Sequence, residues 1–517
     1  MAVRHAQSRR RAGWWVSQVL LTAACMANAH AETWKTTPSI AVEETFTNNV
    51  NLQPSSTRQS DFITQITPAI QFTGLGSHAT ITGTISLPIL LYARTGAENN
   101  QIFPQASVFG RTELVEHFFY VEATANISQQ FLTPFGATPS TIATQTNNQY
   151  TSQVYTLTPY IRGTYGNDVH YDLRDINTWT NANVAATAPS FTNELLGTIQ
   201  RDPNPFGWGA DYDRVTTKFT DQTSFTTQLI RGRGIYQIDP QLQVTLDAGY
   251  EENDYFGGTE QNAIYGFAFK WRPSDRTNFD AGWEHRFFGS SYNVVFTHRT
   301  PLSLWNVFAL RNITSYPQQF AALGAGASVA TTLNQLLSSR VTDPSAREAI
   351  VNQYIQDRGL PSQLTGPVNL YTQQITLQES EGASVGLMGA RNTILFNIYR
   401  QHNEPITAQG NALPDLFSTF NNNTQYGATA VWSTSLSPAL TLTSTLNVSR
   451  VQSNVPNSPT SKQGSFSSII VTPISPLTSV YGGVRYQASR STLPENTFSN
   501  GSYNEFAVYV GLTHLFR

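Results

Sequence analysis

The sequence has a single cysteine, Cys25, among its 517 residues. One thiol excludes an intrachain disulfide and any metal or redox site built from several cysteines. The nine histidines are scattered, and no metal-ligand spacing, glycine-rich phosphate loop or nucleotide-binding fingerprint accompanies them. The sequence therefore predicts neither a metal site nor a bound cofactor.

Charged residues are also scarce, at 13% of the chain, where a soluble domain has about a quarter. Asparagine, threonine, serine and glutamine take their place, and aromatic residues reach 12%. This balance is unusual for a soluble enzyme. It is typical of a membrane barrel whose outer surface is apolar and whose interior is polar without being strongly charged.

Long hydrophobic runs are missing from the chain beyond its N-terminal region. The longest, residues 87–93, has seven residues and contains Pro88, whereas a membrane-spanning helix needs about 20 apolar residues. If the mature chain crosses a membrane, we therefore expect it to cross as β-strands.

The N-terminal region predicts export. Three arginines, residues 9–11, precede an apolar stretch at residues 14–27, and residues 29–31 (Ala-His-Ala) supply a cleavage site. A membrane anchor is the alternative, but polar residues interrupt the stretch and it is short for an anchor. We therefore expect residues 1–31 to be a signal peptide and residues 32–517 to form the mature barrel.

Removal of this leader also removes four arginines and no acidic residue. The formal net charge then changes from −3 to −7, since −3 − 4 = −7. A net negative mature chain argues against nucleic acid as a partner.

The C-terminal segment has a clear strand pattern. From Phe506 to Phe516 every second residue is apolar or aromatic, and those between are small or polar. This period of two describes a strand with two unlike faces. A final strand with a terminal aromatic residue is the signal by which outer-membrane barrels are recognised during assembly, although here Arg517 follows the phenylalanine. We expect Gly511, His514 and Phe516 to carry this signal, with the barrel assembly machinery, outer-membrane lipid and lipopolysaccharide as partners.

The same alternation recurs along the mature chain. Residues 242–250 place their apolar side chains on one face and their polar side chains on the other. Residues 79–89, 277–287 and 440–448 alternate in the same way. Each run is long enough for a tilted strand to cross the hydrocarbon layer, which takes about 9–11 residues.

Tight turns and long connections alternate between these strands, as in outer-membrane barrels. Tight turns such as residues 74–76, 166–167 and 239–240 are rich in glycine, proline, asparagine and aspartate, and we place them on the periplasmic side. We therefore predict an all-β fold, a transmembrane outer-membrane antiparallel β-barrel of about 22 strands, or of 20 if residues 192–222 hold no hairpin. The long connections are expected outside, at residues 95–101, 129–149, 183–192, 255–262, 317–368, 404–421, 454–462 and 492–501.

One long connection, residues 317–368, breaks the strand pattern. Residues 328–340 and 346–357 have helical character, with Asp343 as an N-cap and Pro344 at the first helical position. We therefore expect a short helical insertion in one extracellular loop. Packing against the extracellular rim is the simpler interpretation, and folding into the lumen as a lid or plug is the alternative.

Eleven charged residues fall on positions that should face the barrel interior. A lumen of about 20 strands is too wide for side chains to fill, so these residues could line a polar pathway. They could also pair across neighbouring strands and brace the wall. Tyr160 and Tyr481 offer hydrogen bonds or stacking to sugars, whereas Tyr486 should point to lipid. The candidate lumen-lining residues are Arg162, Asp172, Arg174, Arg231, Arg233, Asp247, Glu251, Lys270, Asp280, Glu284 and Arg286.

No arrangement of residues predicts catalysis. Asp280, Glu284 and His285 are close in sequence, but His285 falls on the lipid-facing side of the alternation and cannot meet Glu284 on one strand face. No set of serine, histidine and aspartate has a recognisable spacing. We therefore expect a protein that is not an enzyme.

Two segments near the start of the mature chain resemble a known family. Residues 43–52 (EETFTNNVNL) are followed by residues 61–70 (DFITQITPAI), and together they look like the opening of the outer-membrane proteins associated with the PEP-CTERM/exosortase system. The helix that begins at residues 343–347 (DPSAR) and the final strand are similar to that family too. The resemblance implies a β-barrel encoded among genes for exopolysaccharide biosynthesis and protein sorting. It implies no reaction and no functional residues.

Three functions remain open from the sequence. The first is a component of exopolysaccharide or PEP-CTERM surface-protein assembly, which could be the conduit itself, with exopolysaccharide or its periplasmic export components as partners. The second is a general or selective porin for small solutes. The third is a structural or interaction barrel that anchors surface polymer. A TonB-dependent transporter is disfavoured, because no globular plug precedes the first expected strand, unless residues 317–368 serve as the plug.

Overall fold

The structure is a computed structural model of the chain. It describes residues 31–183, 189–220, 224–316, 318–319, 328–369, 374–407, 421–455, 458–492 and 501–516. The predicted signal peptide and Cys25 lie outside the described residues, apart from Ala31, with which the first strand begins.

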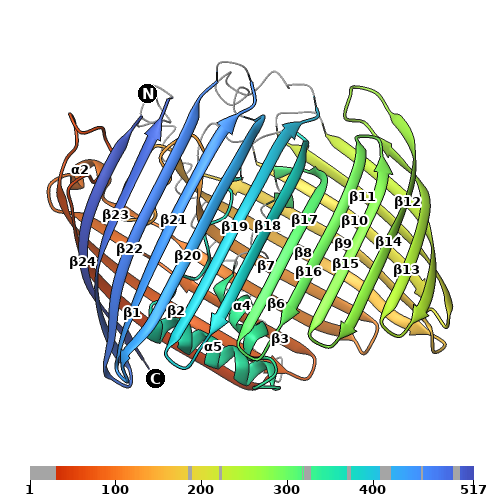
Figure 1. Cartoon of the computed structure of the whole chain (residues 1–517), viewed down its shortest axis with the longest axis horizontal. Coiled ribbons are helices and arrows are strands. Elements are labelled where there is room, and N and C mark those ends of the chain that lie inside the picture. The colour runs from red at the N-terminus through yellow and green to blue at the C-terminus, as the bar shows by residue number, and fades with distance from the viewer. Residues whose placement is uncertain are drawn as a thin grey trace, which may run out of the picture.

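The described chain consists of strands and three short helices (Figure 1). Alternating apolar and polar residues favour strands, because successive side chains of a strand point to opposite faces. None of the helices in the described residues is long and apolar enough to span a membrane. The helices are α2 (Gly96–Asn99), α4 (Val329–Leu337) and α5 (Pro344–Arg358). The strands are β1 (Ala31–Thr47), β2 (Asp61–Gly76), β3 (Ala79–Ser86), β4 (Ile89–Tyr92), β5 (Gln101–Ile102), β6 (Gln105–Val115), β7 (Phe119–Phe131), β8 (Gln149–Tyr165), β9 (Val169–Ala182), β10 (Ser190–Arg201), β11 (Phe206–Phe219), β12 (Phe225–Asp239), β13 (Leu242–Asn253), β14 (Glu260–Ser274), β15 (Thr277–Arg286), β16 (Gly289–Arg299), β17 (Ser303–Thr314), β18 (Thr376–Met388), β19 (Asn392–Pro405), β20 (Asn423–Ser437), β21 (Leu440–Ser453), β22 (Thr460–Ser475), β23 (Thr478–Ser491) and β24 (Tyr503–Leu515).

Two pairs of strand segments are single barrel strands interrupted by proline. β3 and β4 both pair with β2 and are separated by Leu87 and Pro88. β5 and β6 pair with β4 and β3 and are separated by Phe103 and Pro104. Because proline has no N–H to give to a ladder, the two neighbouring strands break at the same level, where the Phe103 N–H donates to the Pro88 carbonyl at 2.9 Å. The 24 segments therefore form 22 barrel strands.

The sheet closes on itself. Neighbouring strands pair antiparallel, and β24 returns to β1 in a register that runs from Ser39 opposite Leu515 to Thr47 opposite Ala507. β10 and β11 form the hairpin within residues 192–222 on which the strand count depended. The prediction of an antiparallel β-barrel of 22 strands is confirmed.

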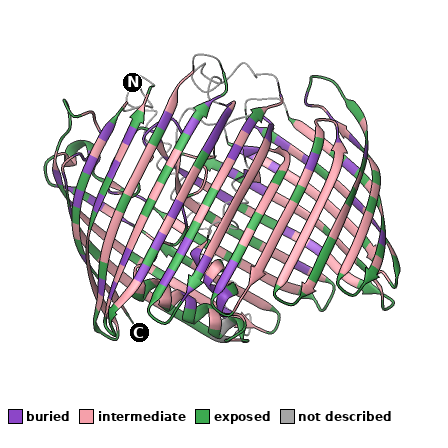
Figure 2. Cartoon of the chain, in the orientation of Figure 1, coloured by how far each residue is buried: buried purple, intermediate pink, exposed green. Residues whose placement is uncertain are grey.

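The outer surface of the barrel is apolar, and exposed residues alternate with buried or half-buried ones along the strands (Figure 2). On β24, Phe506 and Val508 are each 44% exposed, whereas Ala507 between them is fully buried. Tryptophans are exposed on this outward face close to the tight turns, where an aromatic side chain suits the edge of a bilayer. They are Trp34, Trp208, Trp271, Trp305 and Trp432.

The connections differ in length at the two ends of the barrel. Tight turns lie at the end where β1 begins and β24 ends, for example between β8 and β9 and between β20 and β21. Most of the longer connections lie at the other end, near the positions that the sequence predicts. Following the rule for outer-membrane barrels, we name the end with the tight turns the periplasmic end and the other the extracellular end.

The connection between β7 and β8 folds into the barrel, and the prediction that residues 129–149 lie outside it is wrong. Gln463 of β22 donates to the Gly136 carbonyl at 2.9 Å, and Phe135 packs against Val451 of β21. Gln463 and Val451 alternate with outward-facing residues, so they face the lumen. The physical reason is burial: Phe135 is 1% exposed, and an aromatic side chain gains free energy by leaving water.

The helical insertion also lies inside the barrel. It leaves β17 and returns to β18 at the extracellular end, but α4 and α5 lie at the periplasmic end (Figure 1). Both helices contribute to an apolar cluster with Leu304, Leu395 and Val431. These wall residues alternate with exposed residues such as Trp305 and Trp432, so they face the lumen. Packing on the extracellular rim is therefore wrong, and the alternative of a plug in the lumen describes the structure.

The closing seam between β24 and β1 depends on a glycine. Tyr481 of β23 extends over Gly511 of β24 and donates to Glu43 of β1 at 3.0 Å. A Cβ atom at Gly511 would lie 2.4 Å from the Tyr481 ring, so a larger residue does not fit beneath that ring. Tyr481 is thus engaged in the wall and is not a free platform for a sugar.

Replacing Gly511 by leucine is expected to displace Tyr481 and break its hydrogen bond to Glu43. The overpacking and the lost bond together should cost about 2–4 kcal/mol, so a smaller fraction of the protein should fold. The fraction that migrates as folded barrel on unheated SDS gels measures this. Gly482→Leu is the matched control, because Gly482 lies on the outward face and the nearest atom that its Cβ would meet is 3.6 Å away. Equal folding of the two variants would contradict the prediction.

Candidate functional site

The lumen contains the charged residues that the sequence singles out. All eleven occupy strand positions that alternate with the outward apolar positions, so they share the inward-facing set of β8, β9 and β12–β15. We name the inward face of β6–β15 the charged wall. The eleven residues are Arg162, Asp172, Arg174, Arg231, Arg233, Asp247, Glu251, Lys270, Asp280, Glu284 and Arg286.

One group in the charged wall is built around two stacked tyrosines. The rings of Tyr120 and Tyr160 have their centroids 5.1 Å apart. Arg162 lies 4.6 Å from the Tyr120 centroid, and Arg174 lies 4.4 Å from the Tyr160 centroid. The Tyr160 hydroxyl donates to Glu122 at 2.9 Å. Both faces and the hydroxyl of Tyr160 are therefore used within the wall, which leaves no free stacking platform there.

A second group extends from β11 to β15. Asp211 accepts from Arg231 at 2.9 Å and from Arg233 at 2.8 Å, and Arg231 also pairs with Glu284. Arg231 can reach across because Gly249 of β13 lies beneath it: a Cβ atom there would be 2.6 Å from the Arg231 Cβ. The pair of Arg231 with Glu284 braces β12 against β15, two strands that are not neighbours in the sheet.

Two further pairs are held inside the charged wall. Arg286 pairs with Glu251 at 2.6 Å, and the Glu251 side chain is fully buried. Arg174 pairs with Asp172 at 2.7 Å. For these four residues the contacts match the bracing interpretation, since each charge already has its counter-charge.

One other candidate, Lys270, can still meet a solute. Lys270 and Asp280 lie directly opposite each other on β14 and β15, but no ion pair joins them among the described residues. One carboxylate oxygen of Asp247 and one of Asp280 have no hydrogen-bond partner in the described chain, but both oxygens are buried and out of reach of a solute. Lys270, the only exposed residue of the eleven, is therefore the group of this set best able to contact a passing molecule.

The opposite part of the wall is uncharged. β17–β22 are described along their whole length, and every inward position in them is amide, hydroxyl, apolar or glycine. We name this surface the neutral wall. Its inward amides and hydroxyls include Asn306, Gln378, Ser384, Asn397, Gln401, Gln425, Thr429, Thr445, Asn447, Gln463 and Ser465.

The plug helices rest on the neutral wall. Leu333 and Leu336 of α4 are at most 2% exposed and pack in a cluster with Leu395 of β19. Burying side chains of this kind stabilises by about 1.5–3 kcal/mol each. Gly386 of β18 permits the contact, because a Cβ atom there would lie 2.9 Å from the Thr332 side chain. The helices therefore lie where the wall offers an apolar patch and a glycine.

The chain then follows the neutral wall away from the helices. Gly359 ends α5 with a φ of +57°, a conformation that favours glycine. Beyond it, Val368 exchanges two hydrogen bonds with the Gln425 side chain, at 2.9 and 2.8 Å. Thr365 donates to Asn447 at 2.9 Å. This segment covers part of the neutral wall and leaves the charged wall free.

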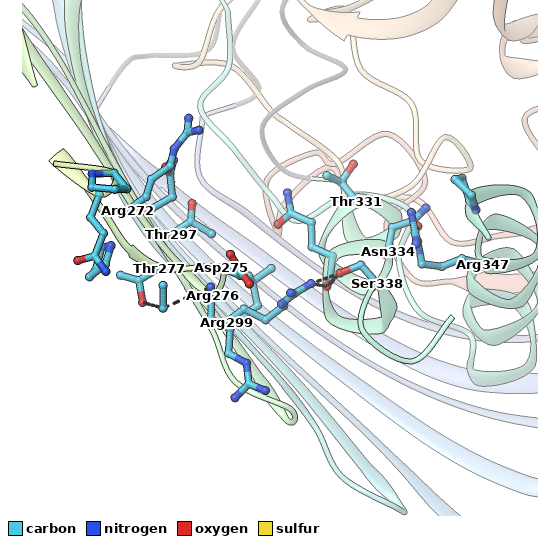
Figure 3. A pocket seen from close by; sticks show the side chains of 18 of the residues that line it. Arg272, Asp275, Arg276, Thr277, Thr297, Arg299, Thr331, Asn334, Ser338 and Arg347 are labelled. Carbon is cyan, nitrogen blue, oxygen red and sulfur yellow. Dashed lines mark hydrogen bonds between the residues drawn. The ribbon is translucent and has the colours of Figure 1, made fainter. Parts of the chain in front are cut away.

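A cavity of about 1020 Å³ remains at the periplasmic end, between the helices and the charged side (Figure 3). We name it the vestibule. Arg299 donates to Ser338, just after α4, and Arg347 donates to Asn334, so these two arginines also hold the helices. With four arginines and two acidic residues the vestibule carries excess positive charge. The six charged lining residues are Arg272, Arg276, Arg299, Arg347, Asp275 and Glu348.

Sequence reasoning missed part of the charged wall. Arg111 and Glu122 face the lumen beside the stacked tyrosines, and Asp211 lies between two arginines. The period of two in β6, β7 and β11 would have found them, because it places them on the inward set. A buried pair near the seam, Arg485 with Glu505 at 2.9 Å, could have been found in the same way. The period of two does not show which of these charges pair with each other.

The three residues of the predicted assembly signal divide between the two faces of β24. Gly511 faces the lumen beneath Tyr481. His514 faces outward, where its ring meets Phe516 edge-on with centroids 4.8 Å apart, and Phe516 is 46% exposed. Their role in assembly stays a prediction.

No family model matches the chain, and no curated protein matches it. Among solved structures, it is similar to the siderophore receptor PirA from Pseudomonas aeruginosa, with 11% identity and a TM-score of 0.44 over 94% of this chain and 81% of that one. It is similar to the FrpB iron transporter from Neisseria meningitidis, with 9% identity and a TM-score of 0.45 over 93% and 81%. It is also similar to OprD from Pseudomonas aeruginosa, with 8% identity and a TM-score of 0.33 over 95% and 98%.

Within the described residues, no group of three or more histidine, cysteine, aspartate or glutamate side chains could hold a metal ion.

Proposed function

We propose that this protein is an outer-membrane channel for small polar solutes, narrowed by its own inward-folded connections. The apolar outer surface and the tryptophans at its edge support placement in an outer membrane. Closure supports it as well, because a barrel without edges satisfies all its backbone groups in lipid. The observation that carries the channel proposal is the vestibule: the helices cover the neutral side of the periplasmic end, and about 1020 Å³ lies open beside the charged side.

The proposed path follows the charged wall into the vestibule. Lys270 is the exposed charge nearest to it along β14, and Arg272 and Arg276 are exposed at its edge. Charged groups that line a narrow passage select ions by their sign. The excess of arginine therefore favours anionic solutes, and no catalytic step is part of the proposal.

Replacing Arg272 by glutamate is expected to shift selectivity toward cations, and adding Arg276→Glu should shift it further, past the point of no preference. Two positive charges become negative, which reverses the sign of the charge excess at the vestibule. The reversal potential of purified protein in a planar bilayer under a KCl gradient measures this.

The matched control for that experiment is Arg201→Glu. Arg201 is exposed near the same end but lies on the outward-facing set of β10, away from the lumen. Its replacement should leave the reversal potential unchanged. If Arg272→Glu behaves like Arg201→Glu, the vestibule is not on the path. If neither the native protein nor a variant without the helices conducts, the channel proposal fails.

We also propose that the solute is a fragment or precursor of a surface polysaccharide. The resemblance of residues 43–52 and 61–70 to the PEP-CTERM-associated barrels supports this. So does the neutral wall, whose amides and hydroxyls both donate and accept hydrogen bonds, as sugar hydroxyls require. Neighbouring genes for glycosyltransferases and an exosortase, and loss of surface polymer on deletion of this gene, are the expected results. If the neighbouring genes have no part in polysaccharide synthesis and the deletion strain keeps its surface polymer, a porin for small solutes remains as the proposed function.

A further inference from the structure

We propose that the outward face of β21–β23 binds the phosphorylated headgroup of an outer-leaflet lipid. Arg450, Lys462 and Arg490 lie directly opposite one another on these three neighbouring strands. All three are exposed and belong to the outward-facing set. Because neighbouring strands are about 4.8 Å apart, the backbone positions of the three cations span only about 10 Å.

No acidic side chain among the described residues neutralises these cations. Within the described residues none of the three forms an ion pair, and Arg450 donates only to the Gln452 amide, at 3.1 Å. Arg400, two strands away in the same row, is by contrast paired with Glu381 at 3.2 Å. Like charges placed directly opposite each other on a sheet are destabilising. A bound anion removes this cost, and phosphate is the anion that three converging cations suit.

The height of the row on the barrel favours a lipid over a soluble anion. Each cation lies within three residues of the extracellular end of its strand: β21 ends at Ser453, β22 begins at Thr460 and β23 ends at Ser491. This level is just above the apolar outer surface, where a lipid headgroup meets water. A soluble phosphate compound would not need a site beside that surface.

A row of apolar residues runs parallel to the cations, four residues nearer to the centre of the strands. Leu446, Phe466 and Tyr486 are directly opposite one another, and each is 42–49% exposed. Tyr486 faces outward, as the sequence predicts. At about 3.3 Å per residue, the two rows are about 13 Å apart along the strands. The cations suit phosphate, and the apolar row beneath them suits acyl chains.

Between the two rows the surface is low over β22 and β23, whereas Val448 of β21 is 49% exposed in the same row. Gly464 and Ala488 lie directly opposite each other there. A Cβ atom at Gly464 would have no neighbour closer than 3.7 Å, so the space above it is open. The sugar of a glycolipid headgroup can therefore approach the sheet between the phosphate-binding row and the apolar row. The lipid A portion of lipopolysaccharide is a phosphorylated glycolipid. Its phosphates suit the row of cations, its sugars the low surface below, and its acyl chains the apolar row.

This inference rests on the outer-membrane placement proposed above, but not on conduction. The test uses the full mature barrel in detergent, with bisphosphorylated lipid A as the probe and native mass spectrometry as the readout. Lys462→Gln with Arg490→Gln is expected to weaken binding about 30-fold, as for two cations removed from an anionic lipid surface. Arg214→Gln with Lys218→Gln is the matched control, because both residues are outward-facing cations of β11, and it should bind as the native protein does.

Three results would overturn the proposal. The first is equal binding of lipid A by the native protein and the Lys462→Gln, Arg490→Gln variant. The second is equal binding of lipid A from which both phosphates have been removed. The third is binding of inorganic pyrophosphate alone with the affinity of lipid A, which would assign the cations to a soluble anion. Bilayer conductance of the same variant should equal that of the native protein, so failure here and failure of the channel proposal are distinguishable.

Discussion

Deleting residues 317–373 and joining β17 to β18 by a short Gly-Ser turn is expected to raise the single-channel conductance severalfold. Thr314 and Thr376 are directly opposite each other, so a tight turn can connect the two strands. The deletion removes α4, α5 and the segment that lies along the neutral wall. A barrel of 22 strands has an interior wide enough for a plugged or water-filled lumen. Planar-bilayer recordings measure the effect, and a far-UV spectrum typical of β-structure verifies the fold.

The deletion does not distinguish a fixed plug from one that swings aside, and a cross-link does. Thr332→Cys with Gly386→Cys joins α4 to β18, where a Cβ at Gly386 would be 2.9 Å from the Thr332 side chain. We expect equal conductance in the oxidised and reduced forms, because the buried leucines of α4 fix the helix to the wall and solute passes through the vestibule instead. A fall in conductance on oxidation would show that the helices move. Unchanged conductance after the deletion would mean that they do not restrict the path.

Replacing Arg485 by alanine is expected to lower the free energy of unfolding by about 3–5 kcal/mol, because it leaves Glu505 as a buried charge without its partner. Arg485 pairs with Glu505 at 2.9 Å, and the Glu505 side chain is fully buried. Thr47 of β1 donates to the same carboxylate at 2.8 Å, so this group connects β23, β24 and β1 in the extracellular half of the seam. Denaturant unfolding of the barrel refolded into lipid vesicles measures the loss.

Two variants separate the lost pair from a general effect of substitution. Arg485→Met with Glu505→Leu removes both charges and should restore most of the stability, since a buried pair can often be replaced by apolar residues. Arg490→Ala changes an outward arginine of the same strand and should cost about 0.5 kcal/mol or less. If Arg485→Ala loses no more than Arg490→Ala, the pair does not stabilise the seam.

The barrel could be predicted because its pattern is local. Each residue of a strand points to the face opposite its neighbour, so the burial of Ala507 beside the exposed Phe506 follows from order in the chain. The same alternation places Asp247 inward and Leu246, which is 64% exposed, outward. The start of α5 at Pro344 is equally local, because a cap and a first-turn proline act on adjacent backbone.

The positions of the inward-folded connections could not be predicted in this way. The apolar face of α4, with Leu333 and Leu336, could have covered the extracellular rim as well as the neutral wall. What decided its position is the apolar patch around Leu395, together with the absence of a side chain at Gly386. These groups come from different strands, and only closure of the barrel brings them to one place.

The sequence alone was enough to establish strands, two unlike faces, an even strand number and a list of inward charges, since all of these follow from residues a few positions apart. It did not show that Arg231 meets Glu284, 53 residues away, over the glycine between them. Nor did it show that the connections after β7 and β17 return into the lumen and that an arginine-lined opening remains beside the helices. Those features depend on which side chains meet across the folded barrel. Contacts of that kind contribute to stability only after folding has brought distant segments of the chain together.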